Sequence, residues 1–476
     1  MLREVFFAFI WIALLILAGR MIKQKIGWIQ RLYLPESIVA GFLALILGPQ
    51  VLGAIVTAVG GDGTWLSDGL FTEPIRDIWS QSPGVFINVV FAALFLGEVI
   101  PNPASIWRKA APQVVFGQSL AWGQYVVGIL VTLIILVPLF DVNPIAGALI
   151  EIGFEGGHGT AGGMAGTLSE LGFEEGADLA LGLATVGIVS GIVAGTVIAD
   201  WGRRKGHVQT EQANVEDSEG MPPELTHGDN PEVRERRRQL SRGLLVDPLS
   251  LNFGFVGIAV IFGWLIQQGL ILIEALTWGR TGFAVMEYVP LFPMALIGGI
   301  LVQLGMVRLG LDALIIPRLT KNIAGLALDV VVVTALASIS LQVIGGNLGV
   351  FLVLSIAGLA WNIGFFMFFA PRIFPDFWLE KGLGDLGQSM GVTATGILLL
   401  TMVDPENKSG AFESFAYKQL FFEPIVGGGL FTAASPVLIS QLGLWVTLLI
   451  TAGLLAFWIG VGFLLIRQQA RTAVAD

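Results

Sequence analysis

The sequence predicts an all-α polytopic membrane protein with two inverted repeats of five transmembrane helices, each with a Gly-rich re-entrant hairpin, plus one extra C-terminal helix. Three observations lead to this fold class. Of the 476 residues, 54% are apolar and only 13% are charged, whereas a soluble domain carries about 25% charged residues. Apolar stretches long enough to cross a bilayer recur along the chain. A Gly-rich motif occurs once in each half of the chain.

The composition also excludes several function classes. The chain has no cysteine, which excludes a disulfide scaffold, a thiol nucleophile, a Cys-ligated zinc and an iron–sulfur cluster. Its net charge of −10 argues against nucleic acid as a partner, because nucleic acid selects basic surfaces. Neither an H-E-x-x-H motif nor a cluster of paired Asp for Mg²⁺-phosphate chemistry occurs. We therefore predict no catalytic residues, no enzyme activity and no resident cofactor.

The predicted spans follow from length and hydrophobicity. A bilayer core of roughly 30 Å needs about 20 apolar residues per helix. Five such spans precede residue 202, at 4–22, 34–59, 84–101, 113–140 and 176–201. Six more follow residue 246, at 249–276, 286–307, 323–345, 347–371, 413–438 and 442–466. The first span is too long for a cleavable signal peptide and lacks a cleavage site.

The distribution of basic residues predicts the orientation. Lys and Arg of short loops stay on the cytoplasmic side of a membrane. With the N-terminus outside and the C-terminus cytoplasmic, all of the 26 lysines and arginines except Arg3, Arg76 and Arg280 lie inside. This count assigns Lys418 to the cytoplasmic side. The bias predicts a multi-pass protein of the cell (inner or plasma) membrane, with the lipid bilayer as a partner.

An internal repeat is visible at a shift of 233 residues. Residues 160–163 (TAGG) fall on 393–396 (TATG), and residues 192–195 (IVAG) fall on 425–428 (IVGG). A direct repeat after five crossings has the opposite topology in the membrane, as in many secondary transporters.

The repeat divides the chain into four parts. Residues 1–201 form the first repeat, and residues 247–440 form the second. The charged segment 202–246 between them is cytoplasmic, and it acts as a flexible linker or as a regulatory segment. Residues 441–476 form the extra transmembrane helix and a cytoplasmic tail.

Two segments are moderately apolar but too interrupted by Gly and polar residues to be full spans. They lie at about 145–166 and 382–402, and the predicted topology places both flanks of each on one side of the membrane. Each is therefore predicted to be a re-entrant hairpin, entering from opposite faces, with irregular backbone that can bind a ligand. Alternatively, the glycines allow tight helix packing, which is the better interpretation for Gly187, Gly191 and Gly195 at every fourth position.

Three short motifs stand out. Residues 155–160 read EGGHGT, residues 384–396 read GDLGQSMGVTATG, and residues 35–41 read PESIVAG. They resemble, in turn, the Gly-Gly-His-Gly-Thr signature, the second Gly-rich run and the early Pro-Glu-Pro-Val-Ala-Gly of the bacterial sodium/glutamate symporter family. The chain departs from the family at Asp385, where the family has His, and at Glu155, where it has Ser.

The resemblance implies a secondary active transporter that couples uptake of L-glutamate, or a close acidic amino acid, to Na⁺ entry by alternating access. It also implies a homodimer with a static scaffold and a moving transport domain. The sequence leaves alternatives open: another organic acid or a less acidic amino acid as substrate, coupling to protons, a channel, or a membrane enzyme.

The predicted substrate-binding residues lie in the two hairpins. Their backbone and neutral side chains offer donors and acceptors for a small molecule, and the half-helix N-termini favour an anion. His158 binds a substrate carboxylate, relays a proton, or orders the hairpin through backbone hydrogen bonds. The full set is Gly156, Gly157, His158, Gly159, Thr160, Gln388, Ser389, Gly391, Thr393 and Thr395.

Ionisable residues inside spans are costly and are functional candidates. Na⁺, the coupling ion, is a hard cation that prefers oxygen ligands. A separate alignment of residues 87–90 (INVV) with residues 328–331 (LDVV) pairs Asn88 with Asp329. The two either bind Na⁺ or form an interhelical hydrogen bond. With them, Asp385 and Glu155 complete the predicted Na⁺ ligands. Glu151, one turn before Glu155, adds a further carboxylate.

Overall fold

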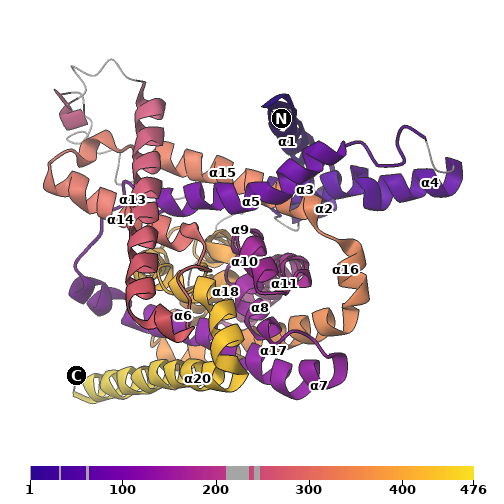
Figure 1. Ribbon diagram of the computed structural model, residues 1–476. Coiled ribbons are helices and arrows are strands. Elements are labelled where there is room, and N and C mark those ends of the chain that lie inside the picture. Colours follow the sequence, from indigo (N-terminus) through magenta and orange to yellow (C-terminus); the bar gives the residue numbers. More distant parts are fainter. Residues whose placement is uncertain are drawn as a thin grey trace.

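In the computed structural model, every regular element of the described residues is a helix and none is a strand (Figure 1). The structure describes residues 2–31, 34–60, 64–208, 210, 235–237, 239–240 and 247–475. The all-helical part of the predicted fold class is therefore confirmed. Most of the predicted linker 202–246 lies outside the described residues.

Ten helices of the described chain are long and apolar enough to cross a membrane. They are α1 (Leu2–Lys25), the run Glu36–Gly60 that contains α3 (Glu36–Leu47) and α4 (Ala54–Gly60), the run Lys109–Phe140 that begins within α6 (Pro103–Val131), α11 (Glu175–Lys205), α13 (Pro248–Leu276), α14 (Leu291–Arg308), α15 (Pro317–Ser338), α17 (Leu348–Ile373), α18 (Trp378–Val403) and the segment Leu430–Gln469 of α20 (Leu430–Ala475). All but α18 overlap predicted spans, so the multi-pass character is confirmed.

Three predicted spans differ from the structure. The span 323–345 is not one helix, because α15 ends at Ser338 and α16 (Leu341–Gly346) is a separate short helix. The span 84–101 corresponds to the end of α5 (Glu73–Ala93), which is not among the ten. The span 413–438 is wrong as a single helix, because α19 (Ala411–Phe422) ends before a non-helical segment at 423–429 and α20 begins only at Leu430. Pro424 disfavours helix at the residue before it and lacks an N–H group. The hydropathy of the segment is unaffected by this break.

Two long helices begin with a side-chain cap. Asn102 accepts a hydrogen bond from the N–H of Ala104 at 2.9 Å at the start of α6, and Asp247 accepts one from the N–H of Ser250 at 3.0 Å at the start of α13. Both caps are followed by a proline at the first helical position, where the missing N–H costs nothing.

The helices form two groups that each draw on both halves of the chain. The first bundle consists of α1, α3, α5, α13, α14 and α15. The second bundle consists of α6, α8 (Leu149–Phe154), α9 (Gly157–Gly163), α10 (Ala165–Glu170), α11, α17, α18, α19 and α20. The two bundles meet where α9 packs against α5 and α15. Figure 1 shows α5 and α15 side by side above α9.

Small residues allow the helices to approach closely. A Cβ atom on Gly187 of α11 would lie 2.2 Å from the carbonyl oxygen of Met390 on α18, and one on Gly195 would lie 2.4 Å from Leu399. Gly191 faces Met390 in the same way. The predicted packing stripe of α11 is therefore confirmed, as expected for helices that associate in lipid.

The outer surface is apolar along whole helices. Large side chains such as Leu17 on α1, Ile261 on α13 and Leu449 and Phe457 on α20 are exposed. Contiguous apolar surface of this kind is suited to lipid rather than water.

Candidate functional site

Helix α18 reverses direction in its middle. Gly391 and Val392 are non-helical, and Val392 has φ 72° and ψ 165°. A Cβ on Gly396 would lie 2.4 Å from the carbonyl oxygen of Gly384, although twelve residues of straight helix would separate these positions by about 18 Å. The two arms of α18 therefore lie side by side, and the glycines at 384, 387 and 396 permit this contact.

A second break separates α8 from α9, and it faces the first. Glu155 and Gly156 lie between the two short helices, and Gly157 has φ +66°. A Cβ on Gly157 would lie 2.3 Å from Cγ1 of Val392. The break of the first half and the break of the second half are thus in direct contact.

The non-helical segment 423–429 completes this centre. Gly427 and Gly428 have φ of 70° and 101°. A Cβ on Gly428 would lie 2.7 Å from Oγ1 of Thr160, and one on Gly427 would lie 3.6 Å from Cγ of Glu155. Only glycine at both positions allows the backbone to lie this close to the α8–α9 break with positive φ.

A buried ion pair lies beside the α18 arms. Nζ of Lys418 on α19 lies 2.8 Å from Oδ1 of Asp385 and donates to Oε1 of Gln388 at 2.6 Å. Nε2 of Gln113 on α6 donates to the other Asp385 oxygen at 2.7 Å. The ammonium also lies 4.0 Å from the ring centroid of Phe422. Lys418 and Asp385 are fully buried, so each charge depends on the other.

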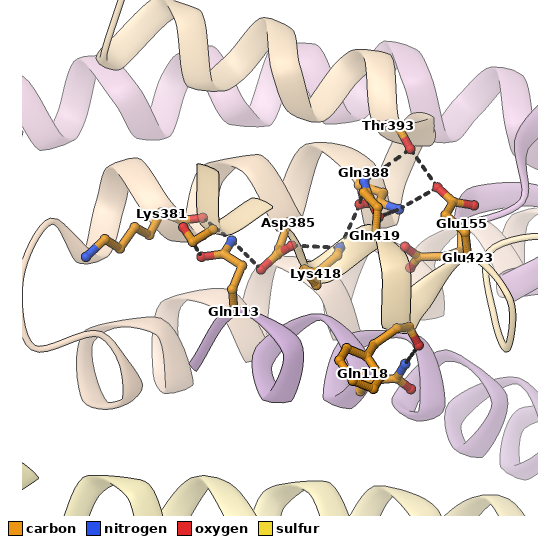
Figure 2. Close-up of polar contacts among 12 residues, drawn as sticks. Gln113, Gln118, Glu155, Lys381, Asp385, Gln388, Thr393, Lys418, Gln419 and Glu423 are labelled. Atoms are coloured by element: carbon orange, nitrogen blue, oxygen red, sulfur yellow. Dashed lines mark hydrogen bonds and ion pairs between the residues drawn. The ribbon is translucent and has the colours of Figure 1, made fainter. Parts of the chain in front are cut away.

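The polar network continues to Glu423, as Figure 2 shows. Gln419 donates to Gln388 at 2.9 Å, and the hydroxyl of Thr393 donates to Oε1 of Glu423 at 2.9 Å. Figure 2 places Glu155 at the same end of the network as Glu423. A line of polar side chains therefore runs from the α6–α18 contact to the facing breaks.

A cavity of about 680 Å³ reaches this end of the network. Thr393, Gln419 and Glu423 line its inner part. At its outer part lie Glu98 and Lys321, whose charged atoms are 2.8 Å apart. A small molecule can thus approach the network through space that the protein does not fill.

Glu151 holds three elements together. Its carboxylate accepts hydrogen bonds from the hydroxyl of Tyr125 on α6 at 2.6 Å, from the hydroxyl of Thr432 on α20 at 2.8 Å, and from the N–H of Gly427 at 2.8 Å. With three donors, this buried carboxylate positions the 423–429 segment against α8.

The structure brings part of the predicted substrate set together. The breaks contain Gly156, Gly157 and Gly391, while Thr160, Gln388, Ser389 and Thr393 lie around them. Gly159 packs against Ile87 on α5. His158 pairs with the hydroxyl of Thr185 on α11 at 2.9 Å, whereas Thr395 donates to the carbonyl of Gly391 within the α18 break.

The predicted Na⁺ ligands do not form one site. Asp385 is paired with Lys418, Asp329 lies beside Ser37 on α3, and the amide of Asn88 donates to carbonyls of its own helix, Gly84 and Val85. No group of three or more His, Cys, Asp or Glu that could hold a metal occurs among the described residues. Of the four predicted Na⁺ ligands, only Glu155 lies at the facing breaks, and it forms no ion pair with the described residues.

Several site residues were not predicted. Lys418, which the count of basic residues treats as a cytoplasmic flank of a span, is buried in α19. Gln113 and Tyr125 come from α6 and lie within the predicted span 113–140, where no motif marks them. Lys418 and Glu423 lie inside the predicted span 413–438, so the rule for ionisable residues within spans would have found both.

Comparison with protein-family models and with curated proteins finds no match for this chain. The resemblance to the sodium/glutamate symporters therefore stays a prediction. Function has to be argued from the geometry of the facing breaks and the network beside them.

Proposed function

We propose that the protein is a cation-coupled secondary transporter whose substrate binds between the α8–α9 break and the α18 break. One observation carries the proposal: two contacting helix breaks adjoin a buried polar network, and a cavity leads to it. Broken helices near the centre of a membrane protein provide free backbone groups and helix ends for a solute. Both breaks are proposed to be tips of re-entrant hairpins.

The helix packing supports two inverted repeats. Suppose that α1, α3, α5 and α6 of the first half correspond, in this order, to α13, α14, α15 and α17 of the second half. The contact between α1 and α3 then corresponds to the contact between α13 and α14. The contact between α3 and α15 corresponds to the contact between α14 and α5. The contact between α6 and α17 joins two corresponding helices, one from each half. There Nε2 of Gln124 donates to Oδ1 of Asn362 at 3.1 Å. Interlocked halves of this kind suit alternating access, in which the second bundle moves against the first.

The charges at the site bear on the substrate. Among the described residues, four buried carboxylates (Glu151, Glu155, Asp385 and Glu423) lie in this region with one buried ammonium group, that of Lys418. Two like charges about 4 Å apart repel by roughly 4 kcal/mol at an effective dielectric constant near 20. L-glutamate, the substrate that the resemblance implies, would therefore need a cation to bind with it. The acidic excess favours a second candidate, a less acidic solute.

The distribution of basic residues predicts which way the cavity opens. It predicts that Glu98, Lys321 and Glu406, which line the outer part of the cavity, lie on the cytoplasmic side. We therefore propose that this conformation is open to the cytoplasm. The Glu98–Lys321 pair lies at the mouth of the cavity, between the segment after α5 and helix α15.

Assembly as a homodimer in the plasma membrane is part of the proposal.

Thr393→Val should lower substrate uptake. The change keeps the shape of the side chain and removes the hydroxyl that lines the cavity and bonds Glu423, so we expect a loss of about tenfold, or ~1.4 kcal/mol. Uptake by purified protein in liposomes measures it. Thr401→Val is the matched control, because that hydroxyl bonds only the carbonyl of Ile397 one turn back. Equal uptake by the two variants would remove Thr393 from the site.

Single cysteines should report the orientation, since the chain has none of its own. Cysteine at Ser169, exposed at the end of α10, should react with an impermeant thiol reagent in intact cells. Cysteine at Glu406, exposed between α18 and α19, should react only after permeabilisation. The opposite pattern would reverse the orientation, and labelling of both from outside would contradict the topology.

A further inference from the structure

Four side-chain oxygens beside the α8–α9 break are buried and have no hydrogen-bond partner in the described chain. They are Oε1 of Glu155, Oε1 of Gln124, Oγ of Ser389 and Oγ1 of Thr160. None of the four residues is more than 2% exposed. Burying a polar atom without a partner costs stability, so such atoms call for an explanation where they gather.

The four residues are held next to one another. Nε2 of Gln124 donates to Oε2 of Glu155 at 3.2 Å and to the carbonyl of Ser389 at 2.7 Å. The Ser389 hydroxyl lies near enough to the Glu155 carboxylate to interact with it, although the contact falls outside ordinary hydrogen-bond geometry. Glu155 and Thr160 both lie against the Gly427–Gly428 segment. Four elements, α6, the α8–α9 break, α9 and the first arm of α18, thus contribute to one cluster.

The chemistry of these atoms selects the ligand. A carboxylate oxygen and an amide oxygen only accept hydrogen bonds, and the two hydroxyls can turn their lone pairs toward the same point. Oxygens with one negative charge among them suit a hard monovalent cation. The Lys418 ammonium does not neutralise the Glu155 carboxylate by direct contact, because it is bound to Asp385 and Gln388.

We propose that Glu155, Gln124, Ser389 and Thr160 form a binding site for a hard monovalent cation, of which Na⁺ is the probe. The proposal rests on the proposed function, because it supplies the coupling ion of the transporter. The repeat gives it a second argument. At the shift of 233 residues, Glu155 corresponds to Gln388, and Gln388 accepts from the Lys418 ammonium at 2.6 Å. In the second half, the Lys418 ammonium lies at the position of Gln388, whereas in the first half the corresponding Glu155 carboxylate has no cation of the described residues beside it.

Thermal unfolding of the purified full-length protein in detergent tests the site without substrate. The measurement compares NaCl, KCl and choline chloride at equal ionic strength, which keeps general screening constant. A ligand that binds only the folded state raises the unfolding temperature. We expect the alkali cations to raise it above the value in choline, with Na⁺ giving a saturable dependence. Glu155→Gln should remove this dependence, whereas Glu170→Gln, at an exposed carboxylate of α10, should retain it.

Ser389→Ala is the second variant, since it removes one neutral oxygen and leaves the Ser389 carbonyl bonded to Gln124. Its half-saturating Na⁺ concentration should rise by about tenfold, as expected for the loss of one ligand oxygen. The site is refuted if the native protein unfolds at the same temperature in NaCl and choline chloride, or if Glu155→Gln and Ser389→Ala respond to Na⁺ as the native protein does. Solute uptake that persists in such a case would leave the transporter proposal standing and remove only this site.

Discussion

Replacing Lys418 by Met should destabilise the protein more than any other single change at the site. The substitution leaves the Asp385 carboxylate buried, with only Gln113 as a donor. Removing one partner of a buried ion pair typically costs about 3–5 kcal/mol, because the remaining charge has lost its counter-charge. Thermal unfolding in detergent and the yield of monodisperse protein measure the loss.

The double variant Lys418→Met with Asp385→Asn provides the control. With both charges gone, Gln113 can still hydrogen-bond the amide, and replacement of a whole buried pair is often nearly neutral. We expect the double variant to recover most of the stability. If the single variant is as stable as the native protein, or the double variant is no better than the single one, the ion pair has no structural role.

Gly157→Ala should abolish most transport activity. The residue has φ +66°, and its added Cβ would lie 2.3 Å from Val392. An L-residue in the left-handed region costs roughly 1–2 kcal/mol, and the clash adds to this by pushing the two breaks apart. We expect uptake per folded protein to fall by about tenfold or more, or ~1.4 kcal/mol and above.

Two further variants separate the clash from the backbone strain. Gly172, in the turn between α10 and α11, has φ +75° and nothing within 4 Å of its Cβ position, so Gly172→Ala carries the strain alone and should transport normally. Adding Val392→Gly to Gly157→Ala removes the opposing side chain at a φ and ψ that glycine prefers. This pair should regain uptake. Equal activity of Gly157→Ala and Gly172→Ala would show that contact between the breaks is unimportant.

Hydrophobicity sufficed to predict most of the helices, because a bilayer demands long apolar segments and helices satisfy their own backbone. It failed at 413–438, where the break at Pro424 and the glycines that follow leave the average hydropathy high. The predicted hairpin 382–402 coincides with α18, which reverses direction at Gly391. The glycines and polar residues that interrupt this segment, rather than its average hydropathy, indicated a break there. The predicted hairpin 145–166 falls on four short helical segments.

The candidate site was only partly predictable, since its members come from helices distant in sequence. Thr160, Thr393 and Glu155 belong to the repeated motif and could be chosen from it. Gln113, Gln124 and Tyr125 reach the site from α6, and no local pattern marks them. The pairing of Asp385 with Lys418 depends on how α18 packs against α19, which spacing along the chain does not specify.

Uptake of labelled amino acids and small carboxylates into proteoliposomes tests most directly whether the facing breaks serve a cation-coupled transporter. The assay compares an inward Na⁺ gradient with choline on both sides, for the native protein and for Thr393→Val. We predict that one class of solute accumulates above its equilibrium level only with the gradient, saturably, and that Thr393→Val loses this accumulation. Solutes that merely equilibrate, at rates that the gradient and the substitution leave unchanged, would contradict the proposal.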